Sequence, residues 1–252
     1  MSALLTLKQV SKRFEQLQAV QGVSLEVPEG RIVGLIGPNG SGKSTLFNLI
    51  SGGLRADAGR IEFGGHDISA SSADAVFRLG LARSFQDPSL FFRMTVLDNA
   101  LLPARRQRGE RPSRAPLHRL WRRQEAGLAE TAGDLLGQYG LRGHYDRLAA
   151  DLSGGQMKLL ELGRGLLGEP RMLLLDEPTA GVAPRLAREI FEQIELLRRT
   201  RGLTFLIIEH RLEILFDFVD SVYVMHLGRV IAHGAPAEVS ANAEVREIYF
   251  GE

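Results

Sequence analysis

Cysteine is absent from the chain, and so is any apolar segment long enough to cross a membrane. Without cysteine, neither disulfide bonds nor cysteine-ligated metal sites can form, and this composition is typical of a reducing compartment. Spanning a bilayer takes about 18–20 successive apolar residues. The N-terminus, MSALLTLKQV, also lacks the basic segment and long apolar core of a secretory signal. We therefore expect any role at a membrane to depend on a partner.

The chain also has little net charge, because its formal charge at pH 7 is +1. Such a balance gives no overall attraction to nucleic acid or to an anionic membrane. The apolar and charged fractions, 44% and 24%, are ordinary for a soluble globular protein. With 252 residues, the sequence is long enough for one large α/β domain or for two small ones.

The spacing of apolar residues predicts strands of two kinds. Leu4 to Val10 and Val20 to Val27 alternate apolar and polar residues, which predicts antiparallel strands. The segment RIVGLIG has the pattern of a buried strand, and it leads through glycines into the helical run KSTLFNLISGGL. A strand, a glycine loop and a helix in this order begin a βαβ unit.

Two later apolar runs, residues 172–175 and 204–208, predict buried parallel strands. Between them, apolar residues recur at helical spacing and predict an amphipathic crossover helix. These residues are Leu186, Ile190, Ile194 and Leu197. The tail SVYVMHLGRVIAHG predicts a hairpin that turns at Leu227–Gly228.

The middle of the chain has a different character. Residues 103–123 hold eight arginines against a single acid, Glu110. The apolar residues that follow lie on one helical face. They are Trp121, Leu128, Ala132, Leu135 and Tyr139. We expect a mostly helical insertion over roughly residues 87–151 with an exposed basic hairpin. This hairpin is either a solvated loop or a contact for anionic lipid headgroups. In the second case, reversing the charge of Arg105, Arg106 and Arg108 would weaken the binding of the isolated subunit to anionic vesicles.

The segment GPNGSGKST at residues 37–45 fits the pattern G-x-x-x-x-G-K-[ST]. Its glycines permit positive φ and let backbone N–H groups wrap phosphates at the positive end of the following helix. Lys43 supplies a charge between the phosphates, and Ser44 offers a hydroxyl to Mg²⁺. The candidate nucleotide-binding residues are Gly37, Asn39, Gly40, Ser41, Gly42, Lys43, Ser44 and Thr45. The motif occurs once and no repeat is present, so we expect one nucleotide-binding unit.

The segment RMLLLDEP places Asp176 and Glu177 at the carboxyl end of a predicted buried strand. Ligands bind at this edge of a parallel sheet. Asp176 is suited to hold the Mg²⁺ shell through water, and Glu177 is suited to orient or deprotonate the water that attacks ATP. The two carboxylates are therefore candidates for the metal and catalytic sites.

A second anion-binding device is predicted at LSGGQ, residues 152–156. A helical pattern follows, so Ser153, Gly154 and Gly155 lie at a helix N-terminus. One ATP needs only one helix N-terminus to bind its phosphates. The second anion-binding helix N-terminus therefore suggests that two subunits face each other and share each nucleotide.

Five segments, GPNGSGKST, RSFQ, LSGGQ, LLLDEP and IIEH, occur in an order and spacing that resemble the nucleotide-binding subunit of ABC transporters. The resemblance covers nearly the whole chain. It is strongest to the ATPases of branched-chain amino acid importers and their urea and amide relatives, from FNLISGGL, RSFQDPSLFFRMTVLDNALL, KLLELGRGLL and EIYFGE. It implies an α/β fold: a P-loop NTPase core with a parallel sheet flanked by helices, an antiparallel β subdomain and a helical subdomain. The core would span residues 1–86 and 161–252 of a single ABC ATPase domain, and the helical subdomain residues 87–160.

The resemblance also assigns roles to single residues. It implies that Phe14 stacks on adenine, with Val20 beside the nucleotide, and that Gln86 reaches Mg²⁺ and the attacking water. Glu177 would be the general base, and His210 would contact the γ-phosphate. Residues 153–156, Ser153, Gly154, Gly155 and Gln156, would bind the ATP of the partner subunit. Ala183 departs from the family pattern, which usually has Asp or Asn there, and this puts a side-chain contact across the dimer in doubt.

The implied partners are transmembrane permease subunits, a second ATPase subunit that is identical or different, and a substrate-binding protein. The segment from Gln86 to Phe92 would contact the permease, at the cytoplasmic side of the cell membrane. ABC ATPases that act on DNA or ribosomes usually carry a long coiled coil or two cassettes in one chain. This sequence has neither feature, so we expect no nucleic-acid partner. The alternative function is ATP hydrolysis that powers a lipopolysaccharide or lipid exporter. No regulatory module is expected after the hairpin.

Overall fold

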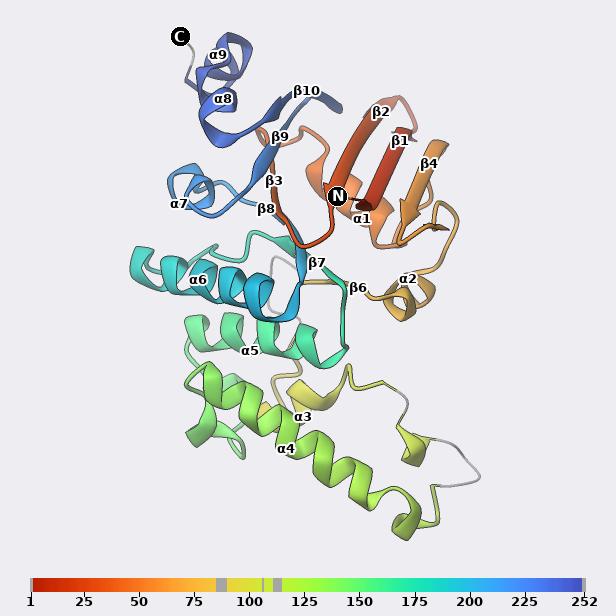
Figure 1. Ribbon diagram of the computed structural model, residues 1–252, viewed down its shortest axis with the longest axis vertical. Helices are drawn as coiled ribbons and strands as arrows, with labels where there is room; N and C mark the ends of the chain where they lie inside the picture. Colours follow the sequence, from red (N-terminus) through yellow and green to blue (C-terminus); the bar gives the residue numbers. More distant parts are fainter. Residues whose placement is uncertain (1, 85–89, 106, 111–114, 251–252) are drawn as a thin grey trace. The chain divides into compact units, whose positions relative to one another are not determined.

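The computed structural model describes residues 2–84, 90–105, 107–110 and 115–250. They form two compact units (Figure 1): a core unit from residues 1–86 and 171–252, and a helical unit from residues 87–170. The expected boundary at residue 160 falls inside helix α5 (Gly154–Leu167), which the helical unit contains whole. Among the described residues, none of the helices is both long enough and apolar enough to cross a membrane.

The core unit contains a six-stranded sheet, parallel except at one edge. Its strands, in order across the sheet, are β10 (Arg229–Gly234), β9 (Ser221–His226), β3 (Ile32–Ile36), β8 (Thr204–Ile208), β7 (Met172–Asp176) and β6 (Leu81–Arg83). Every residue of β3, β7 and β8 is buried. Strands covered on both faces need continuous apolar sequence, which explains why these segments do not alternate. The predicted parallel strands and the hairpin of β9 and β10 are confirmed.

The second sheet of the core unit has four antiparallel strands. In order they are β2 (Leu17–Pro28), β1 (Ala3–Phe14), β4 (Ala58–Phe63) and β5 (His66–Asp67). The alternation of β1 and β2 places Leu5, Leu7 and Val23 in an apolar core shared with helix α1 (Lys43–Ile50). This sheet therefore confirms the predicted antiparallel strands.

Among the described residues of the core unit, six helices are present. They are α1 (Lys43–Ile50), α2 (Ala73–Leu79), α6 (Pro184–Arg201), α7 (Leu212–Phe216), α8 (Pro236–Ala241) and α9 (Ala243–Phe250). Helix α6 is the predicted crossover helix between β7 and β8, and it buries Ile190, Ile194 and Leu197 along one face. It begins with Pro184, which suits a first turn, and ends at Arg201, where Gly202 caps it with a φ of 65°.

In the described part of the helical unit (Figure 1), three α-helices pack on one another. They are α3 (Val96–Leu101), α4 (Arg122–Gln138) and α5 (Gly154–Leu167), joined with the 3₁₀ turns Arg108–Glu110, His118–Leu120, Arg142–His144 and Ala149–Asp151. The predicted apolar face of α4 buries Ala132 and Leu135. In the basic stretch, the described Arg108, Arg119 and Arg122 are exposed, and Arg106, Arg111 and Arg114 lie outside the described residues.

Candidate nucleotide site

The phosphate loop connects β3 to α1 through backbone conformations that only glycine adopts easily. Gly40 and Gly42 have φ values of 78° and 101°. A Cβ atom on Gly42 would lie 2.3 Å from the carbonyl oxygen of Ala19, and one on Gly37 would lie 2.2 Å from that of Met225. Both distances are impossible for real atoms. Glycine at these two positions lets the loop pack against β2 and β9, with the N-terminus of α1 at its end.

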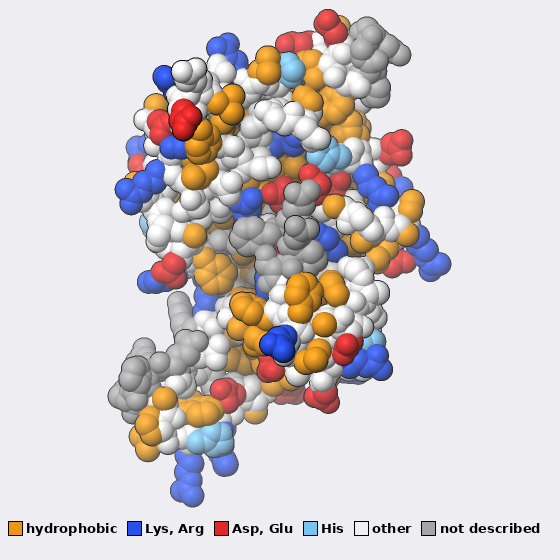
Figure 2. Space-filling model, turned by 180° about the vertical axis from the view of Figure 1, so that it is seen from behind, with side chains coloured by type: hydrophobic (Ala, Val, Ile, Leu, Met, Phe, Trp, Pro, Cys, Tyr) orange, Lys and Arg blue, Asp and Glu red, His pale blue; other side chains and the backbone are white. Residues whose placement is uncertain are grey.

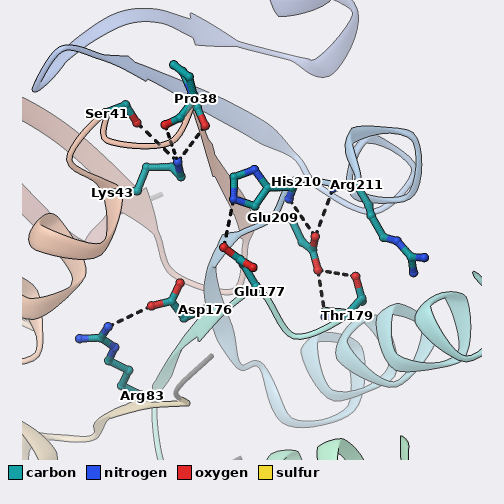
Figure 3. Close-up of polar contacts among 11 residues, drawn as sticks. Pro38, Ser41, Lys43, Arg83, Asp176, Glu177, Thr179, Glu209, His210 and Arg211 are labelled. Atoms are coloured by element: carbon teal, nitrogen blue, oxygen red, sulfur yellow. Dashed lines mark hydrogen bonds and ion pairs between the residues drawn. The ribbon is translucent and has the colours of Figure 1, made fainter. Parts of the chain in front are cut away.

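Lys43 is the first residue of α1, and its side chain is almost completely buried. Its Nζ donates hydrogen bonds to the carbonyl oxygens of Gly37 at 2.8 Å and Pro38 at 3.0 Å (Figure 3). Burial lowers the pKa of Lys43, and the carboxylates of Glu177 and Asp176 oppose this shift. The ammonium group is thus held inside the curve of the phosphate loop.

A pocket of about 520 Å³ opens in front of the phosphate loop. Its lining contains predicted site residues from separate parts of the sequence: Asn39, Gly40, Ser41, Gly42, Lys43, Ser44, Thr45, Glu177 and His210. Tertiary structure therefore brings the phosphate loop together with Glu177 and His210. Gly37 lies at the beginning of the same loop, where it accepts the hydrogen bond from Lys43.

The pocket has a second wall that sequence reasoning missed. Leu17, Gln18, Ala19 and Gln21 line it from β2, and Leu227 and Gly228 line it from the turn between β9 and β10. Gly228 accepts a hydrogen bond from the Gln21 amide at 2.7 Å and donates one to the Ser41 carbonyl at 3.1 Å. No local sequence signal could have found this wall, because the two sheets have to meet before these residues become neighbours.

Val20 and Phe14, two further predicted nucleotide-binding residues, do not line this pocket. The side chain of Val20 has no exposed surface and belongs to the apolar core, and its place beside the nucleotide stays a prediction. Phe14 is 43% exposed at the end of β1 but is not among the residues that line the pocket. Gln86 lies outside the described residues.

Glu177 and His210 approach each other directly (Figure 3). Nε2 of His210 lies 3.0 Å from Oε1 of Glu177. They follow the neighbouring parallel strands β7 and β8, whose ends are in register at Asp176 and Ile208. Glu177 has a φ of 50°, an unfavourable conformation for a non-glycine residue, so the surrounding contacts must hold it there.

Asp176 faces a different partner. Its Oδ2 accepts a hydrogen bond from Nη2 of Arg83 at 3.0 Å, and both side chains are almost buried. Arg83 also donates to Oδ1 of Asn48 on α1 at 2.6 Å. The arrangement links the end of β7 to β6 and to the helix that follows the phosphate loop. Sequence reasoning assigned no role to Arg83, although this residue begins the RSFQ segment, because a pair with an acid 93 residues later leaves no local pattern.

Glu209, the residue before His210, was also missed although a signal was available. It is an acid directly after a buried strand, as Glu177 is, and the same reasoning applies to both positions. Its side chain is only 3% exposed.

In the helical unit, Ser153 precedes helix α5 as predicted. Its Oγ accepts a hydrogen bond from the Gln156 amide at 3.3 Å, and Oε1 of Gln156 accepts one from the Ser153 amide at 2.9 Å. This reciprocal pair is a capping box. Gly154 is exposed at the start of the helix, and Gly155 is half-buried.

A glycine-rich loop between a parallel strand and a helix, with a buried lysine and carboxylates at the ends of the neighbouring strands, defines a P-loop nucleotide-binding protein. The family described as ABC transporter matches residues 20–180. A second family, described as branched-chain amino acid ATP-binding cassette transporter, matches residues 229–252. The chain therefore belongs to the ABC transporter family, and it is an ATPase of that family.

Individual relatives match along almost the whole chain. One from Methanocaldococcus jannaschii, named probable branched-chain amino acid transport ATP-binding protein LivG, is 43% identical over 99% of this chain and 98% of its own. The high-affinity branched-chain amino acid transport ATP-binding protein LivG of Escherichia coli is 35% identical over 99% of this chain and 98% of its own. A solved nucleotide-free ATP-binding cassette from an ABC transporter has a TM-score of 0.86 and 42% identity, covering 100% of both chains. These matches confirm the predicted ABC ATPase fold.

Proposed function

We propose that this ATPase hydrolyses MgATP in the pocket of about 520 Å³ and powers the uptake of branched-chain amino acids or related small polar solutes. The observation that supports the chemistry best is the 3.0 Å approach of His210 to Glu177 beside the phosphate loop. The support for the transported solute is the similarity to relatives named for branched-chain amino acid transport.

In the proposed reaction, the loop and Lys43 bind the phosphates of ATP. Glu177 accepts a proton from a water molecule as that water attacks the γ-phosphorus, and the bond to ADP breaks. His210 orients the Glu177 carboxylate and contacts the γ-phosphate. The half-buried carboxylate of Glu177 avoids much of the competition from bulk water that a fully exposed base would meet.

The residues present fit Mg²⁺. Ser44 is exposed in the pocket, and Asp176 and Glu177 lie close enough to Lys43 to oppose the lowering of its pKa by burial. Mg²⁺ bound to nucleotide needs only a few protein oxygens, because phosphates and water supply the others. Ser44 and Asp176, the latter through water, would hold the ion, which would neutralise charge on the phosphates.

A second ATPase subunit completes the proposed site. The exposed N-terminus of α5, with Ser153, Gly154, Gly155 and Gln156, would cover the nucleotide of the partner. Free N–H groups at a helix N-terminus bind phosphate well. An isolated subunit should therefore bind ATP and hydrolyse it slowly until it dimerises.

The remaining partners follow from the proposed transport. Transmembrane permease subunits would receive the motion of the ATPase pair at the cytoplasmic side of the membrane, and a substrate-binding protein would deliver the solute. Gln86 to Phe92 is the proposed contact segment. Within its described part, Phe91 and Phe92 are 56% and 48% exposed, which suits an apolar contact with a partner.

Uptake measurements test this function. Cells that lack the gene should lose uptake of radiolabelled leucine, isoleucine and valine, and the wild-type gene should restore it while Glu177→Gln should not. Urea uptake in the same cells tests the related solute class. Normal leucine uptake in cells without the gene, with loss of another solute, would overturn the solute assignment. Purified protein should release phosphate from ATP with Mg²⁺ and stop when EDTA is added.

A further inference from the structure

Glu209 is a buried carboxylate with a complete set of hydrogen-bond donors around it. Its Oε1 accepts hydrogen bonds from the amide of Thr179, at 2.9 Å, and from the Thr179 hydroxyl. Its Oε2 accepts hydrogen bonds from the amides of His210 at 2.9 Å and Arg211 at 3.2 Å. Figure 3 shows the Glu209 side chain lying between Thr179 and the backbone at His210.

The burial of this group makes its hydrogen bonds essential. Glu209 is 3% exposed and Thr179 has no exposed surface. A carboxylate removed from water is stable only when hydrogen bonds replace its hydration, and bonds to a charged acceptor are stronger than bonds between neutral groups. Each oxygen of Glu209 faces two donors. Glutamine at this position would turn its NH₂ group, a donor, toward one of the two donor pairs and so lose the hydrogen bonds to that pair.

The two donor pairs come from the two turns that carry the proposed catalytic groups. Thr179 lies two residues after Glu177, in the turn after β7. His210 lies in the turn after β8. A hydrogen bond from the Glu177 amide to the Ile208 carbonyl, at 2.9 Å, is a further link between the same turns. The position of one turn against the other sets the 3.0 Å separation of Glu177 and His210.

We propose that Glu209 is a positioning residue, which holds Glu177 and His210 in the geometry that ATP hydrolysis requires. It does not touch ATP itself, since it is not among the residues that line the pocket. This inference rests on the proposed roles of Glu177 and His210. Misplacing a reacting group by about 1 Å can slow a reaction by about 100-fold. Glu209→Gln should therefore lower kcat about 10- to 100-fold, while KM for ATP and ATP affinity stay within about twofold because the phosphate loop is unchanged.

A double-mutant cycle separates positioning from general support of the fold. If Glu209 acts by positioning His210 against Glu177, then Glu209 has little effect on the rate once the His210 side chain is removed. In a His210→Ala background, Glu209→Gln should slow hydrolysis less than about threefold further, since residues that act as a unit are strongly non-additive. A full further loss of about 10- to 100-fold would overturn the proposal. Slow rates can be followed through radioactive phosphate release over hours.

Variants at Thr179 provide a second route that leaves the carboxylate in place. Thr179→Val removes one hydroxyl donor from Glu209, whereas Thr179→Ser retains it. Positioning predicts that Thr179→Ser keeps a higher kcat than Thr179→Val; equal rates would contradict it. Should Glu209→Gln fail to fold, the same cycle with Thr179→Val and His210→Ala decides the question.

Glu177→Gln must be measured in the same experiments. When it hydrolyses ATP as fast as the wild type, the proposed catalytic role of Glu177 fails. When Glu177→Gln is slow but Glu209→Gln keeps its normal kcat, only the positioning role of Glu209 fails. Glu192→Gln on α6, an exposed carboxylate outside the pocket, is the control variant.

Discussion

Arg83 donates a hydrogen bond to Asp176 at 3.0 Å, although the two side chains are only 11% and 8% exposed. Arg83 ends β6 and Asp176 ends the neighbouring strand β7. The guanidinium group also donates to Asn48 and lies over the ring of Phe47, 5.6 Å from its centroid. Arg83 thus gives the nearly buried carboxylate of Asp176, the proposed outer ligand of Mg²⁺, a partner of opposite charge within the core unit.

Replacing Arg83 with leucine should destabilise the protein by about 3–5 kcal/mol, because Asp176 would remain as a buried charge without this partner. Urea denaturation measures the change in the free energy of unfolding. Arg78→Leu is the control, since Arg78 pairs with Asp74 on α2 while both side chains are largely exposed. An exposed pair contributes about 0–1 kcal/mol. Equal losses for the two variants would show that burial of the Arg83 pair has no special effect.

Glu177→Gln should reduce the rate of ATP hydrolysis about 10²- to 10⁴-fold, the usual contribution of a general base. Glutamine has a similar size but cannot accept the proton from water. ATP binding, followed with a fluorescent ATP analogue, should be retained because Lys43 and the phosphate loop are unchanged. Glu192→Gln should hydrolyse ATP at the wild-type rate. A Glu177→Gln protein with a near-normal rate would place the general base elsewhere.

Ala183→Asp should stabilise the protein by about 0.5–2 kcal/mol, the range measured for helix N-caps. Ala183 precedes α6 with a φ of −63° and a ψ of 150°, the backbone of an N-cap, but it provides no side-chain acceptor. Aspartate would accept a hydrogen bond from the first turn and interact favourably with the helix dipole. Thermal and urea denaturation measure the gain. Ala183→Val, which cannot cap, should give no gain; equal stability of the two variants would refute the capping argument.

His233 should make the stability depend on pH. Its ring stacks on Tyr223, with centroids 3.9 Å apart, and partial burial lowers its pKa from the usual 6.5, with Glu238 opposing the shift. Below pH 6.5 the His233 ring is protonated in the unfolded chain but still neutral in the folded chain. The contribution of His233 to the free energy of unfolding is therefore lost as the pH falls from 6.5 through the lowered pKa of the folded state. His233→Phe should keep the stack and remove this part of the slope.

An NMR titration of the His233 ring gives an independent measurement. Its midpoint should lie below 6.5. Glu238→Gln should move the midpoint lower still, because the opposing carboxylate charge is gone. A midpoint that rises in Glu238→Gln would contradict the assigned causes.

Much of the fold follows from local sequence. The apolar runs of β3, β7 and β8 identified the parallel strands, and Ile190, Ile194 and Leu197 identified the buried face of α6. Hydrophobic periodicity has this power because a strand or helix repeats its environment at a fixed interval. Gly42 and Lys43 were also found, since the phosphate loop is a continuous segment whose function requires a fixed spacing.

Val20 and Glu209 show where local information ended. Val20 was assigned to the nucleotide, but packing between the sheet and α1 buries its side chain completely. Glu209 could have been noticed as an acid after a buried strand, but its hydrogen bonds to Thr179, thirty residues earlier, could not. Neither burial against another element nor a long-range hydrogen bond leaves a regular pattern in sequence.

The sequence by itself determined the class of this protein, its parallel strands, its phosphate loop, and Glu177 and His210 as candidates. Tertiary structure alone decided that Glu177 and His210 lie 3.0 Å apart, that Arg83 pairs with Asp176, and that Leu227 and Gly228 complete the pocket. The physical reason is that motifs record conformations within a continuous segment. Distances between the ends of different strands arise only when the sheet assembles and the buried charges find their partners.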